Sequence, residues 1–262
     1  GVAVTLTMLS TTVLFYFASQ RIWNWSPLRA GIVCLIFGTL EAIFFAANSL
    51  KILHGGWFPL VFGAFVFIIM VTWKDGRALL RKQLPVGMSL EDFIASISIA
   101  GALDEQNKLH RSQGTAIFLA GNPDGTPNAL VKNIKHNQIL HQRNILLTIT
   151  TDNGRPHVPL EERVQIDRQP EGFFRVLASF GFMETPHIEE VLRAANAAGL
   201  EIQSERATFF VGRERIVVTG KGGMAEWREH IFVFLSKHSE NAADFFQLPP
   251  DRVYEVSQVV EI

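Results

Sequence analysis

The sequence predicts a multi-pass α-helical membrane segment of three transmembrane helices, followed by a cytoplasmic α/β domain. The first observation is an uneven distribution of charge, because residues 1–73 hold only four of the 49 charged side chains in the 262-residue chain. The second is an alternation of strand-length and helix-length apolar patterns later in the chain. We expect membrane helices in 1–73, a basic juxtamembrane stretch, an amphipathic helix and a linker in 74–113, and the α/β domain in 114–262.

Composition excludes several classes of protein. Lys and Arg number 24 against 25 Asp and Glu, and 48% of the residues are hydrophobic, so a disordered polymer or a protein that coats nucleic acid is not expected. The one cysteine, Cys34, excludes an intrachain disulfide and a C-x-x-C site, and is compatible with a reducing cytoplasm around the soluble part. The chain opens at Gly1 without an initiator methionine or a basic leader, from which we expect it to be part of a longer protein.

Three apolar stretches have the length of a membrane span. They cover residues 2–19, 30–50 and 55–73, and contain 18, 21 and 19 residues. At a rise of about 1.5 Å per residue, each is about as long as the roughly 30 Å hydrocarbon core of a bilayer. The alternative is a cluster of buried core helices in a soluble protein, which three consecutive spans with short polar hinges make less attractive.

Positive charge predicts the orientation of these spans. Basic residues are expected on the cytoplasmic side of a membrane protein. The first connection would then lie inside, the second outside, and everything after Trp73 in the cytoplasm. The basic residues that support this are Arg21 and Arg29 at the first connection, and Lys74, Arg77, Arg81 and Lys82 after the third span.

Polar side chains within the spans are candidate functional residues. Glu41 lies in the second span, where an ionised carboxylate is costly, so it should face protein or water, either as a packing contact or in a proton-linked role. Thr5, Thr7 and Thr11 form part of a hydroxyl-bearing stripe on the first span. Such a stripe either joins helices together or lines an ion path, because threonine oxygens can replace the water of a cation.

An amphipathic helix is expected shortly after the membrane segment. Ser89 is placed to cap it with Asp92 in reciprocal contact, and Leu90 opens an apolar face spaced as in a helix. This face could dock on the following domain or lie on the membrane surface. The polar stretch 104–113 is predicted to be a linker.

The remaining sequence predicts an α/β domain that folds by itself from about Gly114. Apolar strands are expected at 115–120 and 144–151, parallel and joined by a helix at 128–142. A helix capped by Thr185 should bury Ile188, Val191, Leu192 and Ala195, and end near Gly199. The other expected elements are a strand at 173–178, a hairpin of 207–211 and 216–219, a long helix lined by Met224, Trp227, Ile231 and Phe234, and a strand at 252–262.

Catalytic and metal-binding motifs are missing from this sequence. It contains no G-x-S-x-G, H-E-x-x-H, Walker A or strand-following G-x-G-x-x-G pattern, and 220–223 is predicted to be a flexible turn, so no enzyme and no cofactor are expected. His136 and His141 are poorly spaced to share a metal on one helix. A basic face of Lys132, Lys135, His136 and Arg143 could meet an anion, a lipid headgroup or an acidic partner, or could be solvated surface.

At this point the chain resembles the carboxy-terminal third of the bacterial Kup (KUP/HAK/KT) potassium uptake transporters. The resemblance covers nearly the whole sequence in order, and eight short anchors in succession make it specific. They are Gly1-Val-Ala-Val-Thr5 with Thr7-Met8, Phe44-Phe45-Ala46-Ala47-Asn48, Gly55-Gly56-Trp57-Phe58-Pro59, Asn122-Pro123-Asp124-Gly125, Lys135-His136-Asn137 with Leu140-His141, Gly181-Phe182-Met183-Glu184-Thr185-Pro186, Phe209-Phe210-Val211-Gly212-Arg213-Glu214, and Met224 with Trp227-Arg228-Glu229.

This resemblance implies a symporter that moves K⁺ together with H⁺ across the inner membrane. It implies about twelve spans with an inverted-repeat core, of which the present spans would be the last three. The first would lie in the core with Thr5, Thr7 and Thr11 near the ion path, and Glu41 would be peripheral. The residues that coordinate K⁺ would lie in the missing part. Ser179-Phe180 departs from the Arg-Tyr pair often found in the family.

The resemblance also suggests partners for the soluble domain. In some relatives this domain supports dimerisation and regulation by a small nucleotide, although no nucleotide-contact motif matches here residue by residue. Two alternatives remain at this stage. One is a membrane-anchored regulatory, ligand-binding module without transport activity, and the other is a membrane-tethered enzyme.

Overall fold

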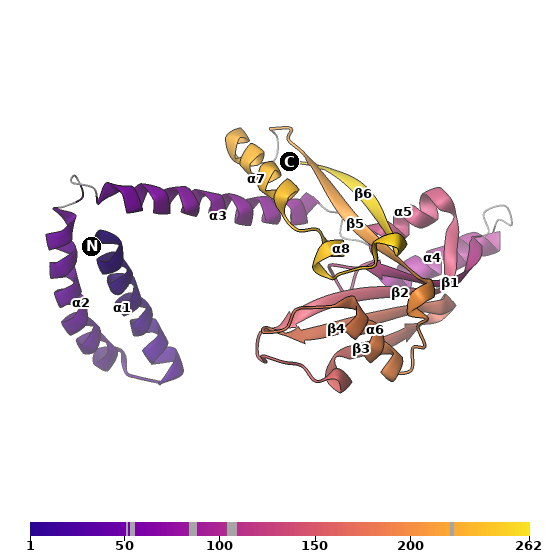
Figure 1. Cartoon of the computed structure of the whole chain (residues 1–262), viewed down its shortest axis with the longest axis horizontal. Coiled ribbons are helices and arrows are strands. Elements are labelled where there is room, and N and C mark those ends of the chain that lie inside the picture. The colour runs from indigo at the N-terminus through magenta and orange to yellow at the C-terminus, as the bar shows by residue number, and fades with distance from the viewer. Residues whose placement is uncertain (51, 53–55, 84–87, 104–108, 221–222) are drawn as a thin grey trace. The chain divides into compact units, whose positions relative to one another are not determined.

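The computed structural model describes residues 1–50, 52, 56–83, 88–103, 109–220 and 223–262. The chain divides into two compact units, Gly1–Asp75 and Gly76–Ile262, and helix α3 (Trp57–Gln83) runs from the first into the second (Figure 1). Several sequence predictions fall outside the described residues. They are the start of the third span at Gly55, the linker segment 104–108 and the middle of the turn at 220–223.

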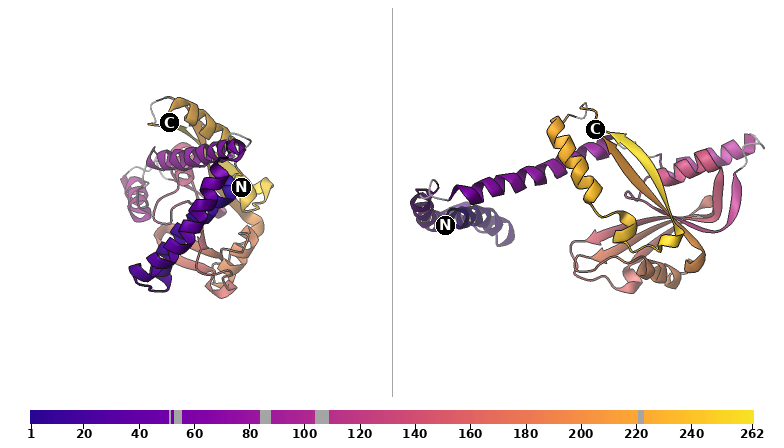
Figure 2. Two further views of the ribbon diagram at one scale, coloured as in Figure 1. Left: turned by 90° about the vertical axis from the view of Figure 1, so that its left-hand side faces the viewer. Right: turned by 45° about the horizontal axis from the view of Figure 1, so that its top comes forward.

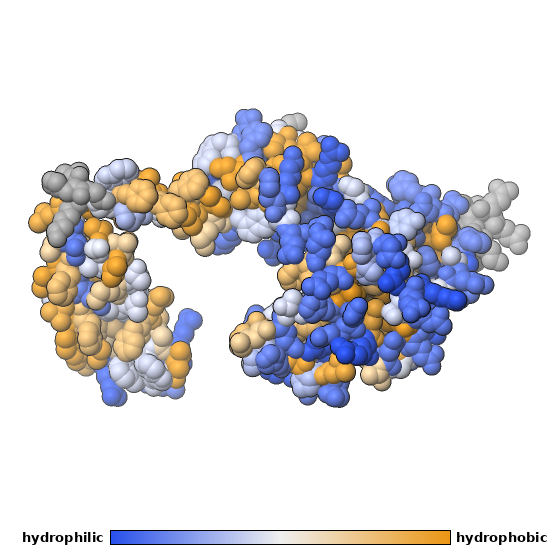
Figure 3. Space-filling model, in the orientation of Figure 1, coloured by the Kyte–Doolittle hydropathy of each residue, from blue (hydrophilic) through white to orange (hydrophobic). Residues whose placement is uncertain are grey.

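Three long apolar helices are present, as predicted. Helices α1 (Val2–Ile22), α2 (Pro27–Ser49) and α3 have 21, 23 and 27 residues, and each is long and apolar enough to cross a membrane. Their apolar side chains are largely exposed, as lipid-facing side chains should be, and they cover the surface of α1 and α2 in Figure 3. Helix α2 begins where Ser26 accepts a hydrogen bond from the Arg29 amide and Pro27 takes the first helical position.

Helix α3 continues beyond the apolar stretch that ends at Trp73. Its last ten residues carry the basic side chains of the juxtamembrane stretch, so this stretch is helical up to Gln83. Leu, Ala, Lys, Arg and Gln dominate there, and these residues favour helices. At about 1.5 Å per residue the whole helix is about 40 Å long, enough to extend past the hydrocarbon core into the headgroup region.

The second unit contains the predicted α/β fold, built on a six-stranded sheet in the order β3-β4-β2-β1-β5-β6. All neighbouring strands are parallel except the edge strand β3, which is antiparallel to β4. The strands are β1 (His110–Leu119), β2 (Ile139–Asp152), β3 (Val164–Gln169), β4 (Phe173–Gly181), β5 (Ala207–Val217) and β6 (Val253–Glu261).

Helices cover both faces of this sheet. Neighbouring residues of a strand point to opposite faces, and Ile117 and Phe118 accordingly belong to different core clusters. The Ile117 cluster includes the inner face of α6 (Ile188–Ala197), whereas the Phe118 cluster includes α4 (Leu90–Leu103) and α5 (Asn128–Asn137). Figure 2 shows the twist of the sheet and the long β5 and β6 strands. The other helices are α7 (Glu226–His238) and α8 (Ala242–Phe245).

The amphipathic helix α4 docks on the domain rather than leaving its apolar face free. Leu90, Phe93 and Ile94 are buried in the Phe118 cluster. Ser89 caps the helix, since its hydroxyl accepts a hydrogen bond from the Asp92 amide at 3.1 Å. The Asp92 carboxylate accepts from the Ser89 hydroxyl at 2.7 Å, instead of from a backbone amide as the predicted reciprocal contact required.

Helix α5 ends earlier than predicted. It stops at Asn137 because Gln138 adopts a left-handed conformation, with φ 54° and ψ 30°. Ile139 and Leu140 then pair with the start of β1. Their apolar character continues the helical pattern of the sequence, so periodicity alone could not separate the last helical turn from a strand that pairs over its whole length. His141 is consequently a strand residue and not a helical one.

The predicted hairpin around Arg213 is wrong. Residues 207–217 form the single strand β5, which pairs residue by residue with β6 from Phe209 to Val217. The polar sequence at 212–215 resembles a turn, but pairing with the parallel strand β6 outweighs this weak local preference.

The linker predicted at 104–113 is shorter than expected, because its last residues from His110 belong to β1.

The predicted inner face of the last long helix is also wrong. In α7, Trp227 and Phe234 are 55% and 62% exposed, while Phe232 is completely buried. Five consecutive apolar residues occupy 231–235, so helical spacing fits more than one face.

Helix α6 has no such ambiguity, and its predicted inner face is buried as expected. It ends at Ala197, two residues before Gly199, whose φ of 84° suits glycine.

The loop after β4 is held by a buried ionic network. Arg163 has a side chain only 6% exposed, and it donates hydrogen bonds to the carboxylates of Glu184, at 2.5 Å, and Glu190. Glu184 also accepts from the amides of Gly181, at 2.6 Å, and Val158, at 3.0 Å. Burial raises the pKa of Glu184, but these two amides and the Arg163 guanidinium outweigh it and hold the pKa below its usual value.

Gly181 is required in this loop by close approach. A Cβ atom at this position would lie 2.1 Å from the carbonyl oxygen of Pro156, and a backbone atom cannot move aside as a side chain can. The run Gly181-Phe182-Met183-Glu184, one of the anchors of the sequence resemblance, thus closes the loop 152–163 over the end of β4.

Candidate functional site

The candidate site lies between α1 and α2, at a hydrogen bond between two polar side chains. The hydroxyl of Thr12 donates to a carboxylate oxygen of Glu41 at 2.8 Å. The thiol of Cys34 donates to the backbone carbonyl of Thr12 at 3.5 Å, so the same helical turn of α1 is bound twice by α2. A polar contact between two apolar helices in lipid is stabilising, because hydrocarbon offers no other partner.

The three predicted ion-path threonines bond within their own helix. Thr5, Thr7 and Thr11 donate to the carbonyls of Val2, Ala3 and Thr7, respectively, at 3.0, 2.9 and 2.9 Å. Each hydroxyl proton is therefore engaged, and the oxygen lone pairs remain available to accept a hydrogen bond or to contact a cation.

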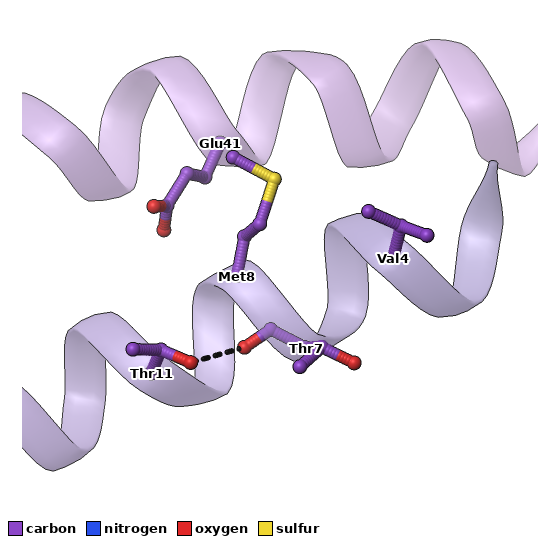
Figure 4. A pocket seen from close by; sticks show the side chains of 5 residues that line it. All are labelled: Val4, Thr7, Met8, Thr11 and Glu41. Carbon is purple, nitrogen blue, oxygen red and sulfur yellow. Dashed lines mark hydrogen bonds between the residues drawn. The ribbon is translucent and has the colours of Figure 1, made fainter.

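A pocket of about 340 Å³ brings some of these residues together. It is lined by Val4, Thr7, Met8, Thr11 and Glu41, with Glu41 reaching from α2 towards the side chains on α1 (Figure 4). Thr5 does not line it and is buried elsewhere. The pocket is mainly apolar, with threonine hydroxyls on one wall and one carboxylate on the other. Another helix could pack against such a surface, or a small polar ligand could bind there. The roles of the lining residues stay predictions.

Sequence reasoning missed Thr12 as the partner of Glu41. Thr12 belongs to the hydroxyl-rich run of the first span, which was a signal that it is functional or structural. Its pairing with Glu41 depends on how α1 and α2 rotate against each other, and no pattern within either helix reveals that rotation.

The predicted basic face of the α/β domain is divided between two elements. Lys132, Lys135 and His136 lie on α5, where the Lys132 ammonium donates to the Ser257 carbonyl at 2.7 Å. Arg143 lies on β2, and its guanidinium donates to the backbone carbonyls of Leu200 and Glu201 at 3.0 and 2.8 Å. The Arg143 side chain therefore binds the loop after α6. The other three residues of the predicted basic face lie on α5.

His141 lies close to the aromatic core. Its ring lies 6.1 Å from that of Phe210, and burial lowers its pKa from the usual 6.5. Among the residues that the structure describes, no group of three His, Cys, Asp or Glu side chains is arranged to hold a metal ion.

Comparison with known protein families now identifies the chain. A family model described as the K⁺ potassium transporter C-terminal domain matches residues 113–262, more than half of the chain. A second model, the K⁺ potassium transporter integral membrane domain, matches residues 1–78. The chain belongs to the Kup family of potassium transporters. The Kup family is a family of membrane transporters and not of enzymes, and the three apolar helices coincide with the end of its integral membrane domain.

Individual Kup relatives match along the entire chain. A probable potassium transport system protein Kup 2 of Chromobacterium violaceum is 44% identical over 264 residues, which cover 100% of this chain and 41% of the relative. Proteins described as probable potassium transport system protein Kup from Chlorobium chlorochromatii and Acidithiobacillus ferrooxidans are 37% and 41% identical, again over 100% of this chain and over 41% and 39% of theirs. The chain thus spans about two fifths of the length of these Kup relatives.

Proposed function

We propose that the chain is the last membrane part and the regulatory domain of a K⁺:H⁺ symporter of the bacterial inner membrane. Its membership in the Kup family is the observation that supports this proposal most directly. The missing part of the protein would supply the remaining spans and the main K⁺ ligands. In this proposal the α/β domain serves dimerisation and regulation, and the protein takes up K⁺ alongside H⁺.

The orientation in this proposal has the α/β domain in the cytoplasm. Arg21 and Arg29 flank the connection between α1 and α2, and four further basic residues lie on α3 after Trp73. Two α-helical spans separate these two basic regions, so both can face the cytoplasm as the positive-inside rule requires.

Thr7 and Thr11 are the residues of this chain that we propose beside the ion path. They line the pocket with Glu41, and because their hydroxyls donate their protons to backbone carbonyls, the oxygens can still act as acceptors or cation ligands. Thr5, the third predicted member, is buried away from the pocket and makes the same kind of hydrogen bond within its helix. It is therefore a matched control for the loss of a threonine hydroxyl from α1.

Potassium-uptake complementation tests the proposed function. The full-length parent, expressed in a bacterial strain without other K⁺ uptake systems, should restore growth at low external K⁺. Thr11→Val should weaken uptake several-fold, because replacing one oxygen next to a cation costs about 1 kcal/mol or more, whereas Thr5→Val should leave it nearly unchanged. A parent that binds but never imports K⁺ would contradict the symporter proposal, and equal uptake by the two variants would contradict the ion path.

For Glu41 we propose a packing role through Thr12. Glu41→Leu and Thr12→Val in the full-length parent should each lower its thermal stability in detergent, because a hydrogen bond between membrane helices contributes about 0.6 to 1.7 kcal/mol. Glu41→Gln retains an oxygen for the Thr12 hydroxyl and should have the smallest effect. Selectivity for K⁺ should change little in all three. Unchanged stability together with abolished proton coupling would instead assign Glu41 to proton transfer.

A further inference from the structure

A cleft between α4 and α5 takes no part in the proposed transport function. Its volume is about 350 Å³, within the range of small-ligand pockets. The apolar side chains of Phe93 and Ile97 on α4 lie on one side, and those of Val131 and Ile134 on α5 lie on the other. Lys135 on α5 and Gln138, the residue that directly follows α5, add polar groups. The cleft is therefore an open, mainly apolar hollow, against which a hydrocarbon chain can lie with polar groups beside it.

Lys135 brings a positive charge to this cleft. In the part of the chain that the structure describes, its ammonium has no hydrogen bond or ion pair. Lys132, three residues earlier on the same helix, donates instead to the Ser257 carbonyl at 2.7 Å. No carboxylate lines the cleft among the described residues. An apolar cleft that carries an ammonium group is complementary to a hydrocarbon chain with an anionic head.

The membrane is a source of such molecules, and the chain itself ties the cleft to it. Helix α3 is long and apolar enough to span the bilayer and ends at Gln83, and α4 begins at Leu90. The seven steps between these residues can extend to at most about 25 Å. The basic residues in the last turns of α3 also attract anionic headgroups to this part of the membrane. The short connection to a membrane-spanning helix and the basic end of that helix therefore favour a membrane phospholipid over a soluble amphiphile.

We propose that the cleft between α4 and α5 binds an acyl chain of an anionic phospholipid, with its phosphate near Lys135. The lipid would contact α4 and α5 together, and so would connect the α/β domain to the charge of the bilayer surface. No covalent step is involved. This proposal is independent of the direction and the coupling of ion transport.

Photochemical crosslinking in lipid nanodiscs tests this binding. The full chain is reconstituted in phosphatidylcholine containing a small fraction of phosphatidylglycerol with a diazirine on one acyl chain, and adducts are mapped by mass spectrometry. We expect adducts on residues 93–97 and 131–138. Labelling should fall about fivefold when the same diazirine is carried by phosphatidylcholine, and by about the same factor in Lys135→Gln.

Two further variants separate this proposal from general adsorption of lipid. Lys237→Gln removes one exposed positive charge from α7 and should leave labelling of the cleft unchanged. Ser96→Trp, at another lining position, should reduce labelling by filling the cleft without a change in charge. Equal labelling by both phospholipid probes, or labelling insensitive to both Lys135→Gln and Ser96→Trp, would overturn the proposal. Labelling by a free diazirine fatty acid but not by phosphatidylglycerol would also overturn it, in favour of a soluble ligand.

Discussion

A fragment of the α/β domain that starts at Met88 should unfold cooperatively, whereas one that starts at Gly114 should be strongly destabilised or fail to fold. The shorter fragment lacks α4, which buries Leu90, Phe93 and Ile94 to exposed fractions of 0%, 8% and 6%. Burying each such side chain contributes about 1.5 to 3 kcal/mol, so their loss removes much of the roughly 5 to 15 kcal/mol that stabilises a typical domain. Urea unfolding followed by circular dichroism measures the difference.

Single substitutions in the longer fragment make the same test when the shorter one cannot be purified. Phe93→Ala should lower the free energy of unfolding by about 3 to 5 kcal/mol, because it leaves a cavity in the core. Ile99→Ala, on the same helix but 59% exposed, should change it by less than about 0.5 kcal/mol. Equal unfolding midpoints for fragments with and without α4 would show that the domain begins near Gly114, as the sequence alone suggested.

Glu184→Ala should be the most damaging polar substitution in this domain. It removes the acceptor of two backbone amides and leaves the buried guanidinium of Arg163 with one carboxylate fewer. Breaking a buried ion pair from one side costs about 3 to 5 kcal/mol. Glu190→Ala is the matched control, because the Glu190 side chain is 37% exposed and should contribute about 1 kcal/mol or less. Urea unfolding of the fragment from Met88 compares the two.

The same network predicts a sensitivity to acid. Because the pKa of Glu184 is lower in the folded domain than its usual value of 4.5, the unfolded chain binds the proton more readily. The contribution of Glu184 to stability is therefore complete above pH 4.5 and is lost as the pH falls through the lower folded pKa. Glu184→Gln should reduce the loss of stability over this acidic range. An unchanged acid profile would show that the ionised form of Glu184 is not preferentially stabilised.

Amphipathic patterns predicted those elements whose apolar residues specify one face. The inner face of α6 was readable because Glu189, Glu190 and Arg193 occupy its other face. The docking residues of α4 were readable because Leu90, Phe93 and Ile94 have helical spacing after a capping serine. Helix α7 was not readable in this way, since 231–235 is apolar all round. The end of α5 was missed for a related reason: Ile139 fits both a continued helix and a strand, and the pairing of β2 with β1 decides between them.

For the candidate site, too, the sequence revealed some features and not others. An acid in the middle of an apolar span and a run of threonines on the preceding span were visible as polar residues in lipid-length helices, whose burial has to be compensated. Their geometry was not visible. Which threonine contacts Glu41 depends on the rotation of α1 against α2. In the structure it is Thr12, and the sequence had indicated no particular partner for Glu41.

The sequence by itself determined that this protein crosses a membrane, that an α/β domain follows, and to which family it belongs, because hydrophobic length, charge distribution and short residue runs are properties of the chain. Tertiary structure alone decided that α4 completes the core, that 207–217 is one strand, and that Glu41 meets Thr12. These outcomes depend on contacts between residues far apart in the sequence, where packing and strand pairing outweigh local preference.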